Sequence, residues 1–492
     1  MKPNCWTLSF LIVAILAAGT FRASAFEMRM AADVLSLHAK DTPLRDILAQ
    51  FQEAGVKVAI DERISPLITA NFKNREIGDG IKHLLADCDY ALTWQTIDGP
   101  AGKMRRISEI FVYKPGSRRP LPPLPAPKPA TVENPISKTN TILCLKNEIL
   151  LRLRPGTTKE QLLALLRETG TTIMDSIPSL GLYRLHFPSD VNLADLLNSL
   201  AKNPYTAHVE PNQVYQSLSP SKYPDTQTAS SLRPITSGNG GAVAILDSGF
   251  TPNAALEKAV VATLDATAPG AAISDPLGHG TQMALIAAGA INPEGGDSSF
   301  DSQTGSIIPI RTMDETGKTS GFTLMQSMIF ALNQGARVIN MSWGSETDSG
   351  FFNDAVTYAK QRGAIPVVAA GNKPTNQPTY PAASPEVLAV AALGPDGSFW
   401  DQSNYASFVQ LAAPGFATMP IGYEGPPGLY GGTSIAAAYT SRVISRYFAI
   451  HPTATANEAI HSLTQSLSRP ASGASHPEIP RLDSAAVSRY LK

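Results

Sequence analysis

Long apolar runs without polar alternation recur through the C-terminal half of the chain. They are AVAIL (242–246), IIPIR (307–311), VINMSW (338–343), IPVVAAG (365–371), VLAVAAL (387–393) and VQLAAP (409–414). A strand that is covered on both faces has no polar face, so such runs are typical of parallel strands flanked by helices. The stretches between the runs are long enough for those helices. We therefore predict an α/β domain, a parallel sheet with helices on both faces, over residues 221–492.

A shorter pattern precedes this domain, over residues 141–220. The order strand, helix, strand, strand, helix, strand fits the segment between Glu148 and Gln216. Thr158, with Gln161 three residues later, forms a capping box that opens the first helix. The second helix carries a leucine stripe formed by Leu193, Leu196, Leu197 and Leu200. A sheet has to cover that stripe, so we predict a ferredoxin-like α+β domain.

Residues 26–114 predict a separate small α+β module. One helix has Pro43 at its first position with Asp41 or Thr42 as its cap, and a second helix begins near Ile77. Short runs typical of strands lie around the helices, at Val56–Ile60, Ile68–Phe72 and Ile107–Tyr113. The module holds no arrangement of residues that indicates catalysis.

Two further segments are not expected to join these domains. Residues 115–140 are dense in proline, which favours extended polyproline II and predicts a semi-rigid linker. Residues 1–25 hold Lys2, an apolar stretch from Trp6 to Ala18 and the small-x-small pattern Ala23-Ser24-Ala25. The alternative, a membrane anchor, needs about 20 continuous apolar residues, and this stretch is shorter. We predict a signal peptide cleaved after Ala25, and hence export to the periplasm, the cell envelope or the extracellular medium.

Composition and charge narrow the possible partners. Hydrophobic residues make up 43% of the 492 residues and charged residues 16%, below the usual level of about 25%, which indicates a large core. The 40 Lys and Arg residues nearly balance the 41 Asp and Glu residues, so the chain has no net field to hold nucleic acid. Cys88 and Cys144 remain after removal of the signal, without zinc-site spacing. A disulfide between them and two unpaired thiols both fit the sequence.

Three residues of complementary chemistry fall where strands end or helices begin. Asp247 follows AVAIL, His279 precedes the helical run QMALIAAGAI, and Ser434 follows two glycines and a threonine where a long helix begins. A serine hydroxyl needs an imidazole to take its proton, and the imidazole needs a carboxylate to fix its tautomer and stabilise its cation. Functional groups of parallel sheets gather at the carboxyl ends of strands, so the three predict a catalytic triad. Taken singly, each residue also fits a turn, a structural histidine or a helix cap.

The motifs Asp247-Ser248-Gly249, Gly278-His279-Gly280-Thr281 and Gly432-Thr433-Ser434, in this order, resemble those of subtilisin-like serine proteases, the subtilase or peptidase S8 family. The resemblance covers residues 240–450 and implies a subtilisin-like fold that hydrolyses peptide bonds. It also implies that the side chain of Asn372 and the backbone amide of Ser434 form the oxyanion hole.

The same resemblance implies a substrate site. Its residues are Ser342, Trp343 and Gly344, in the strand that pairs with the substrate backbone, and Gly371, Lys373 and Thr379 at the specificity pocket. Thr379 stands where the family usually has a glycine at the pocket floor, and Lys373 lies near the rim. We therefore predict a shallow pocket that favours small or medium side chains, and acidic ones through Lys373.

The chain departs from the family pattern at two helices. Met283-Ala284-Leu285 follows the histidine where Val-Ala-Gly is usual, and Ala438-Tyr439 stands where the family has a proline. We expect both changes to alter helix packing rather than any reacting atom. No cofactor is predicted. Calcium commonly stabilises the family, but no Asp-rich loop with ligand spacing is present, and ligands dispersed along the chain are left open.

Resemblances also cover the two smaller domains. LRPGTTKEQL and NPYTAHVEPNQVYQ, within residues 141–220, resemble the prodomain of subtilisin-like proteases, which is a folding template and an intramolecular inhibitor. LHAKDTPLRDILAQF and FVYK, within residues 26–114, resemble the short N-terminal module of secretins and TonB-dependent receptors. That likeness implies an envelope protein as partner, and an unrelated fold without a partner is the alternative.

These predictions combine into one function and one rival. The chain is expected to be an exported serine endopeptidase acting on proteins or peptides. It would be made as a zymogen that cuts itself between about Val214 and Pro234. The rival is a catalytically silent or permanently capped protein that docks in the cell envelope.

Overall fold

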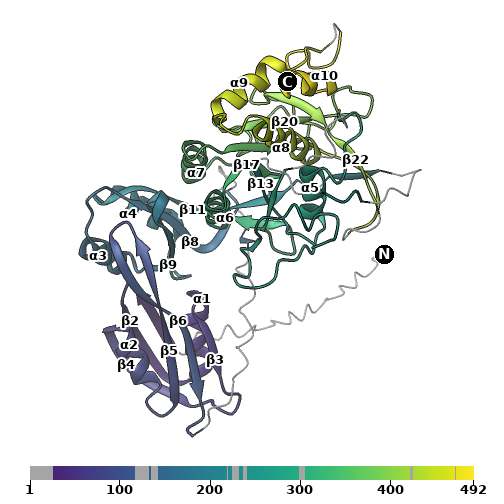
Figure 1. Ribbon diagram of the computed structural model, residues 1–492. Helices are drawn as coiled ribbons and strands as arrows, with labels where there is room; N and C mark the ends of the chain where they lie inside the picture. Colours follow the sequence, from purple (N-terminus) through teal and green to yellow (C-terminus); the bar gives the residue numbers. More distant parts are fainter. Residues whose placement is uncertain are drawn as a thin grey trace, which may run out of the picture. The chain divides into compact units, whose positions relative to one another are not determined.

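The computed structural model describes residues 26–116, 132–133, 142–218, 220–223, 232–235, 241–297, 305–420, 425–470 and 473–492. The predicted signal peptide and almost all of the predicted linker lie outside these residues. The chain forms two compact units (Figure 1). One comprises the residues up to Gln95 together with Arg106–Pro127, and the other comprises Thr96–Arg105 and the residues from Lys128 onward.

The N-terminal module, residues 26–114, consists of two three-stranded sheets and two helices. Its elements are β1 (Phe26–Ala31), β2 (Val34–Pro43), α1 (Leu44–Glu53), β3 (Lys57–Ile60), β4 (Leu67–Glu76), α2 (Ile77–Leu84), β5 (Asp89–Gly99) and β6 (Gly102–Tyr113). The sheets have the orders β1-β2-β4 and β3-β6-β5. The predicted cap of α1 is wrong: Thr42 still pairs with Ile68 in the sheet, and Pro43 itself is the cap residue, without a side-chain hydrogen bond.

The predicted prodomain, residues 141–220, has the expected order of elements. They are β8 (Cys144–Leu153), α3 (Lys159–Thr169), β9 (Thr172–Ile177), β10 (Leu182–His186), α4 (Leu193–Lys202) and β11 (Thr206–Ser217), with a short 3-10 turn at Pro178–Leu180. The antiparallel strands pair in the order β11-β8-β10-β9, and β7 (Val132–Glu133) pairs with β8. The capping box of Thr158 and Gln161 is present at the start of α3.

The predicted catalytic domain, residues 221–492, is built on a seven-stranded parallel sheet. In spatial order the strands are β14 (Leu264–Asp265), β15 (Ile307–Arg311), β13 (Ala242–Asp247), β17 (Ala336–Met341), β19 (Ile365–Ala369), β20 (Leu388–Leu393) and β21 (Leu411–Pro414). The helices are α5 (His279–Ala288), α6 (Gly321–Asn333), α7 (Gly350–Gln361), α8 (Thr433–Ile450), α9 (Ala456–Ser466) and α10 (Ser484–Tyr490). Where the structure describes this domain, it also has five short strands: β12 (Ser221–Tyr223), β16 (Lys318–Ser320), β18 (Trp343–Gly344), β22 (Phe416–Met419) and β23 (Gly428–Gly431). The six apolar runs therefore form the parallel strands that they predict.

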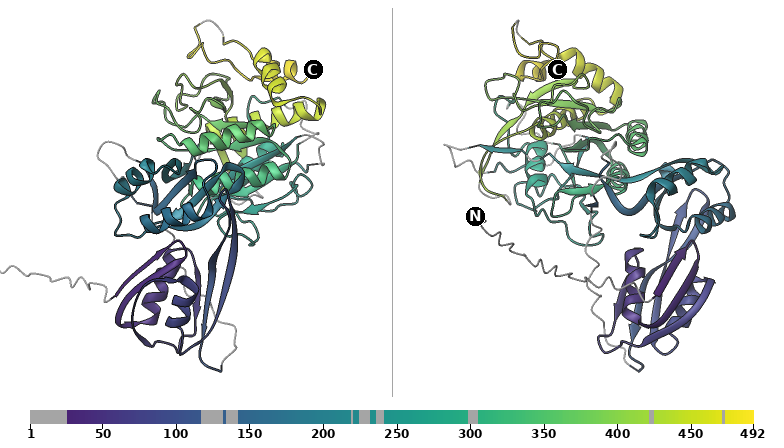
Figure 2. Two further views of the ribbon diagram at one scale, coloured as in Figure 1. Left: turned by 90° about the vertical axis from the view of Figure 1, so that its left-hand side faces the viewer. Right: turned by 180° about the vertical axis from the view of Figure 1, so that it is seen from behind.

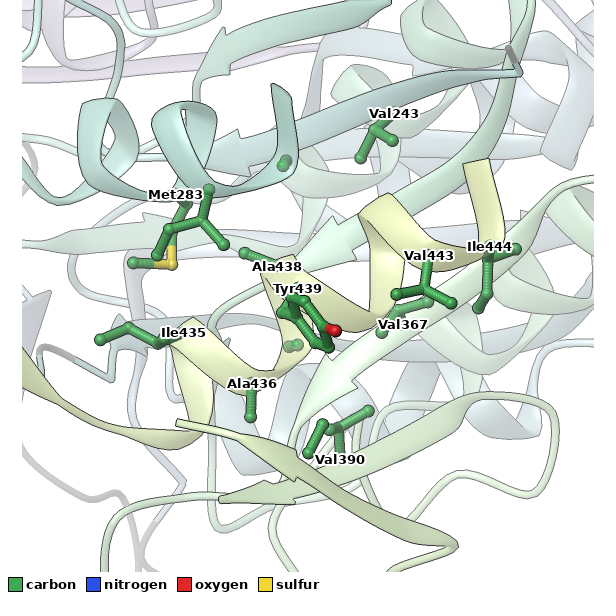
Figure 3. Packing of buried hydrophobic residues seen from close by; sticks show 14 of the residues in the cluster. Val243, Met283, Val367, Val390, Ile435, Ala436, Ala438, Tyr439, Val443 and Ile444 are labelled. Atoms are coloured by element: carbon green, nitrogen blue, oxygen red, sulfur yellow. The ribbon is translucent and has the colours of Figure 1, made fainter. Parts of the chain in front are cut away.

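Helices cover both faces of this sheet, as the unbroken apolar runs require. Val243 and Ile245 of β13 pack in the core beneath α5 and α8, whereas Ala244 and Leu246 pack beneath α6 and α7. Figure 3 shows the first core, with α8 lying next to strand residues such as Val367 and Val390.

The two departures from the family pattern also lie in this core (Figure 3). Met283 and Tyr439 are fully buried, and the Tyr439 hydroxyl accepts a hydrogen bond from the amide of Asp297 at 2.8 Å.

The prodomain packs against the α6 and α7 side of the catalytic domain, and both belong to one compact unit (Figure 2). Leu150, Leu182 and Tyr215 join the core that contains Phe322 of α6 and Phe352 of α7. Beyond the prodomain sheet, β11 continues into the catalytic domain and pairs with β16 and β18. The two domains predicted from the sequence thus share a core and a strand.

Two smaller predictions concern membranes and thiols. Within the described ranges, no helix has the length and apolar character needed to cross a membrane. Neither Cys88 nor Cys144 is in a disulfide, so the disulfide alternative is not the one that the structure has.

Candidate active site

The predicted catalytic residues lie at the carboxyl edge of the parallel sheet and at two helix starts. Asp247 is the last residue of β13, and Asn372 follows β19. His279 is the first residue of α5, and Ser434 is the second residue of α8. The sheet therefore positions the carboxylate of Asp247 and the amide of Asn372, and the two helices position the other two side chains, the imidazole and the hydroxyl.

Asp247 and His279 form a buried pair. Nδ1 of His279 lies 2.6 Å from Oδ1 of Asp247, and the same oxygen accepts a hydrogen bond from the amide of Ser248 at 2.7 Å. A close backbone approach makes this pair possible, because a Cβ on Gly280 would lie 2.2 Å from the carbonyl oxygen of Gly249. Gly280 is thus required where the end of β13 meets the start of α5, and Gly249 is required as well because its own Cβ would lie 1.9 Å from the carbonyl oxygen of Ser274.

The surroundings of His279 favour its protonated form. Burial alone would lower the pKa of His279, but the charge and hydrogen bond of Asp247 and the charge of Asp275 outweigh it and raise that pKa. Nε2 of His279 is buried and has no hydrogen-bond partner among the described residues. The Asp247 contact at Nδ1 leaves Nε2 as the nitrogen that can exchange a proton.

Ser434 and Asn372 meet at one carbonyl oxygen of the chain itself. The Ser434 hydroxyl donates to the carbonyl oxygen of Leu218 at 2.8 Å, and Nδ2 of Asn372 donates to the same oxygen at 3.3 Å. Oδ1 of Asn372 accepts from the amide and the hydroxyl of Thr433, at 2.9 and 2.8 Å. These contacts turn the amino group of Asn372 toward Leu218.

The predicted substrate strand also contacts this segment. The amide of Leu218 donates to the carbonyl oxygen of Ser342 at 3.0 Å, and Gln216 and Ser217 pair with Gly344 and Trp343. The indole of Trp343 is buried and donates to the carbonyl oxygen of Leu246 at 2.9 Å. Trp343 therefore contributes its backbone to pairing and its side chain to the core.

Sequence reasoning missed a second strand on the other edge of β11. Val214, Tyr215 and Gln216 pair antiparallel with Ser320, Thr319 and Lys318 of β16. Three residues of mixed polarity have no periodicity that predicts a strand, so β16 cannot be predicted from its own sequence.

Of the three predicted pocket residues, Thr379 adjoins the substrate strand, Gly371 lies beside Thr379, and Lys373 has no contact there. An ideal Cβ on Gly344 would lie 2.8 Å from Cγ2 of Thr379, and one on Gly371 would lie 3.6 Å from Oγ1 of Thr379. The side chain of Lys373 is exposed, and the described residues give it no hydrogen bond or ion pair.

A second buried carboxylate, Asp275, was also missed. Its Oδ1 accepts from the Ser248 hydroxyl at 2.7 Å and the Gly278 amide at 3.0 Å. Its Oδ2 accepts from the amide and hydroxyl of Thr281 at 2.7 and 2.6 Å, while the Ser248 hydroxyl accepts from the amide of Gly280 at 2.8 Å. Asp275 thereby ties the first turn of α5 to the end of β13, on either side of His279. An Asp-Pro-Leu-Gly sequence before a histidine reads as an ordinary turn, so no local signal marks this role.

The residues present do not identify a metal site. Across the part of the chain that the structure describes, no group of three or more His, Cys, Asp or Glu residues is arranged to hold a metal ion.

Comparisons with known proteins find relatives for two parts of the chain. The model of the subtilase family matches residues 238–479, and that of the fervidolysin N-terminal prodomain matches residues 131–212. Thermitase of Thermoactinomyces vulgaris is 33% identical over 190 residues, which cover 38% of this chain and 68% of thermitase. An extracellular protease of Xanthomonas campestris is 26% identical over 339 residues, which cover 57% of this chain and 58% of that protein.

The fold has a counterpart among solved structures. The crystal structure of fervidolysin from Fervidobacterium pennivorans, described as a keratinolytic enzyme related to subtilisin, matches with a TM-score of 0.55. The match covers 71% of this chain and 61% of fervidolysin at 19% identity, a level that speaks for the fold alone. With the family match and the thermitase relationship, the chain belongs to the subtilase family of serine endopeptidases.

Proposed function

We propose that the chain is an exported serine endopeptidase made as a self-processing zymogen, with Ser434 as nucleophile, His279 as general base and acid, and Asp247 as the group that orients and stabilises the imidazole. Asn372 and the backbone amide of Ser434 would stabilise the oxyanion. The observation that carries the proposal is the carbonyl group of Leu218, which is contacted by both the Ser434 hydroxyl and the Asn372 amide.

The proposed roles define a sequence of proton transfers. His279 takes the Ser434 proton on Nε2 as Oγ attacks a peptide carbonyl carbon, and Asp247 stabilises the imidazolium through Nδ1. Asn372 donates to the oxygen that becomes negative. His279 then returns the proton to the leaving amine, and a water molecule, activated in the same way, releases the acyl group from Ser434.

Several contacts support the prodomain as the intramolecular inhibitor. Its strand β11 lies between β16 and β18, where an extended substrate would bind by strand addition. Glu210 accepts hydrogen bonds from the hydroxyl of Ser349 and, at 3.2 Å, from the amide of Gly350 at the start of α7. Asn212 accepts from the amide of Phe322 in the first turn of α6 at 3.1 Å. The prodomain thereby accepts hydrogen bonds from amides at two helix starts of the catalytic domain.

The pocket residues support a preference for medium-sized side chains at the cleaved position. Thr379 narrows the space beside Gly344, and the residue that the chain itself presents is Leu218. A peptide-library profile should therefore favour residues up to the size of leucine. Profiles dominated by large aromatic residues would contradict this preference, and Lys373→Ala tests whether acidic residues depend on that cation.

Export and the N-terminal module belong to the same proposal. The N-terminal sequence pattern supports export, and the Xanthomonas relative is itself named an extracellular protease. We propose that the N-terminal module binds an envelope protein, on its sequence resemblance alone. A pull-down that compares the full chain with a chain lacking residues 26–114 as bait tests that binding.

Hydrolysis of an unfolded protein substrate separates the enzyme from the rival capped scaffold. The processed chain should release new amino termini from a denatured protein, whereas Ser434→Ala and His279→Ala should release none. Thr440→Ala removes another buried α8 hydroxyl, one bonded within its own helix, and should keep the activity. A processed chain no more active than Ser434→Ala would contradict the proposal.

A further inference from the structure

The segment that joins the prodomain to the catalytic domain is held on both sides of Leu218. Before Leu218, β11 pairs with β16 and β18. After it, β12 pairs antiparallel with β23, with Ser221 opposite Gly431 and Tyr223 opposite Leu429. Since β23 leads through Gly432 to Ser434, the chain lies along the site like an extended substrate with residues on both sides of the bond to be cut.

The side chains fix which carbonyl group reaches Ser434. Tyr215 is 1% exposed and packs against Trp343 and Phe352, with ring centroids 5.2 and 5.6 Å away, whereas Gln216 is exposed. A slip of one residue would exchange these two environments, because neighbouring strand residues face opposite sides. The burial of Tyr215 therefore sets the register that brings Leu218 to the hydroxyl of Ser434.

The contacts of β12 lie entirely on the leaving-group side of Leu218. The ring of Tyr223 packs against Phe416 with centroids 5.4 Å apart. Both rings lie over Gly431, where a Cβ would be 2.9 Å from Cε2 of Tyr223 and 2.6 Å from Cε1 of Phe416. Gly431 thus makes room for an aromatic pair, and breaking the bond after Leu218 removes none of these contacts.

We propose that the chain cuts itself at the peptide bond after Leu218, and that β12 stays paired with β23 after the cut and blocks the leaving-group side of the site. The cut chain then has two blocking strands, β11 on one side and β12 on the other. This inference rests on the proposed endopeptidase function and adds the bond that is processed and a second inhibitory element.

The chemistry of the step balances within the chain and water. Oγ of Ser434 bonds to the Leu218 carbonyl carbon while His279 accepts its proton. The bond from that carbon to the nitrogen of residue 219 breaks, and the nitrogen leaves with the proton from His279. Water then adds a hydroxyl group to the acyl carbon and returns a proton through His279 to Ser434. The products are a carboxylate at Leu218 and a free amine at Ser219.

The first bond that is cut can be identified by intact mass and by amino-terminal sequencing of the fragments during the first minutes of processing. The first new amino terminus should be Ser219 and the first prodomain fragment should end at Leu218, while Ser434→Ala stays uncut. Another first cut by a chain that hydrolyses protein substrates overturns the inference and leaves the proposed function standing. A chain that neither cuts itself nor hydrolyses substrates overturns both.

The blocking role of β12 is tested by comparing two peptide substrates that have the same residues before the cleaved bond. One has a p-nitroanilide leaving group, and the other continues for four residues beyond the bond. In the processed enzyme, diluted until the prodomain has dissociated, Tyr223→Ala should raise kcat/KM for the extended substrate about tenfold, since an aromatic pair with its burial is worth about that factor. The anilide should be hydrolysed as before.

Lys222→Ala, an exposed change on the same strand, is the matched control and should change neither rate. An equal effect of Tyr223→Ala on both substrates, or none on the extended one, would overturn the blocking role. Equal rates of fluorophosphonate labelling for Tyr223→Ala and the parent confirm that the site is folded, so loss of pairing and loss of structure are told apart.

Discussion

Tyr215 is the side chain whose substitution most easily tests inhibition by the prodomain. It is 1% exposed, and its ring contacts Trp343 and Phe352 of the catalytic domain. A buried tyrosine hides about 150 Å² or more, and truncating a large buried aromatic residue to alanine costs about 3 kcal/mol or more. If that loss falls on binding between the cut prodomain and the catalytic domain, Tyr215→Ala should weaken inhibition by about 100-fold.

The assay is the appearance of peptidase activity when the processed, non-covalent complex is diluted. Tyr215→Ala should become active at protein concentrations about 100 times higher than the parent does. Gln216→Ala, next on β11 but exposed, should stay within about threefold of the parent, because it removes little buried surface. Equal behaviour of the two variants, or an unchanged transition for Tyr215→Ala, would refute the assigned register and the anchoring role of this ring.

Three further predictions concern single side chains. Asn372→Ala should lower kcat about 100- to 1,000-fold with little change in KM, the size of effect that loss of the same donor has in subtilisin; steady-state kinetics that show less than a tenfold loss would contradict its role. Because the base must be neutral, kcat/KM should rise with pH through the raised pKa of His279. Asp275→Asn removes one of the charges that raise that pKa, so it should move this rising part of the pH profile to lower pH. An unshifted profile would contradict the effect of Asp275 on His279. Burial lowers the pKa of His186 from 6.5 to about 4, because it outweighs the charge of Glu148, which raises that pKa, and is assisted by the charge of Arg184. His186 therefore contributes its full stabilisation above pH 6.5, and the free energy of unfolding should fall by up to about 3 kcal/mol as the pH drops toward 4. Urea unfolding of the Ser434→Ala chain should show this loss, and an unchanged pH dependence after adding His186→Gln would count against it.

The sequence predicts much of the catalytic domain because its signals are local. An unbroken apolar run such as IPVVAAG specifies a strand buried on both faces, and the glycines beside His279 and Ser434 specify close backbone approaches. The structure brings His279 to Asp247 and Asn372 to the carbonyl group that Ser434 contacts.

Features that depend on a partner segment could not be read in this way. Strand β16 exists because β11 lies beside it, and Leu218 is distinguished by the register of a strand that begins in another domain. Asp275 acts through four hydrogen bonds to residues on two elements. The cap of α1 was misplaced because Thr42 remains paired in β2, an interaction that local helix signals do not report.

The most direct test of the central claim is the mass of the processed chain after reaction with a fluorophosphonate. We expect one phosphonyl group per chain, located on Ser434 by peptide mapping. We also expect no adduct in Ser434→Ala and much slower labelling of His279→Ala, in which the serine lacks its base. A processed chain that stays unlabelled, or a label that maps to a different serine, would contradict the assignment of Ser434 as the nucleophile.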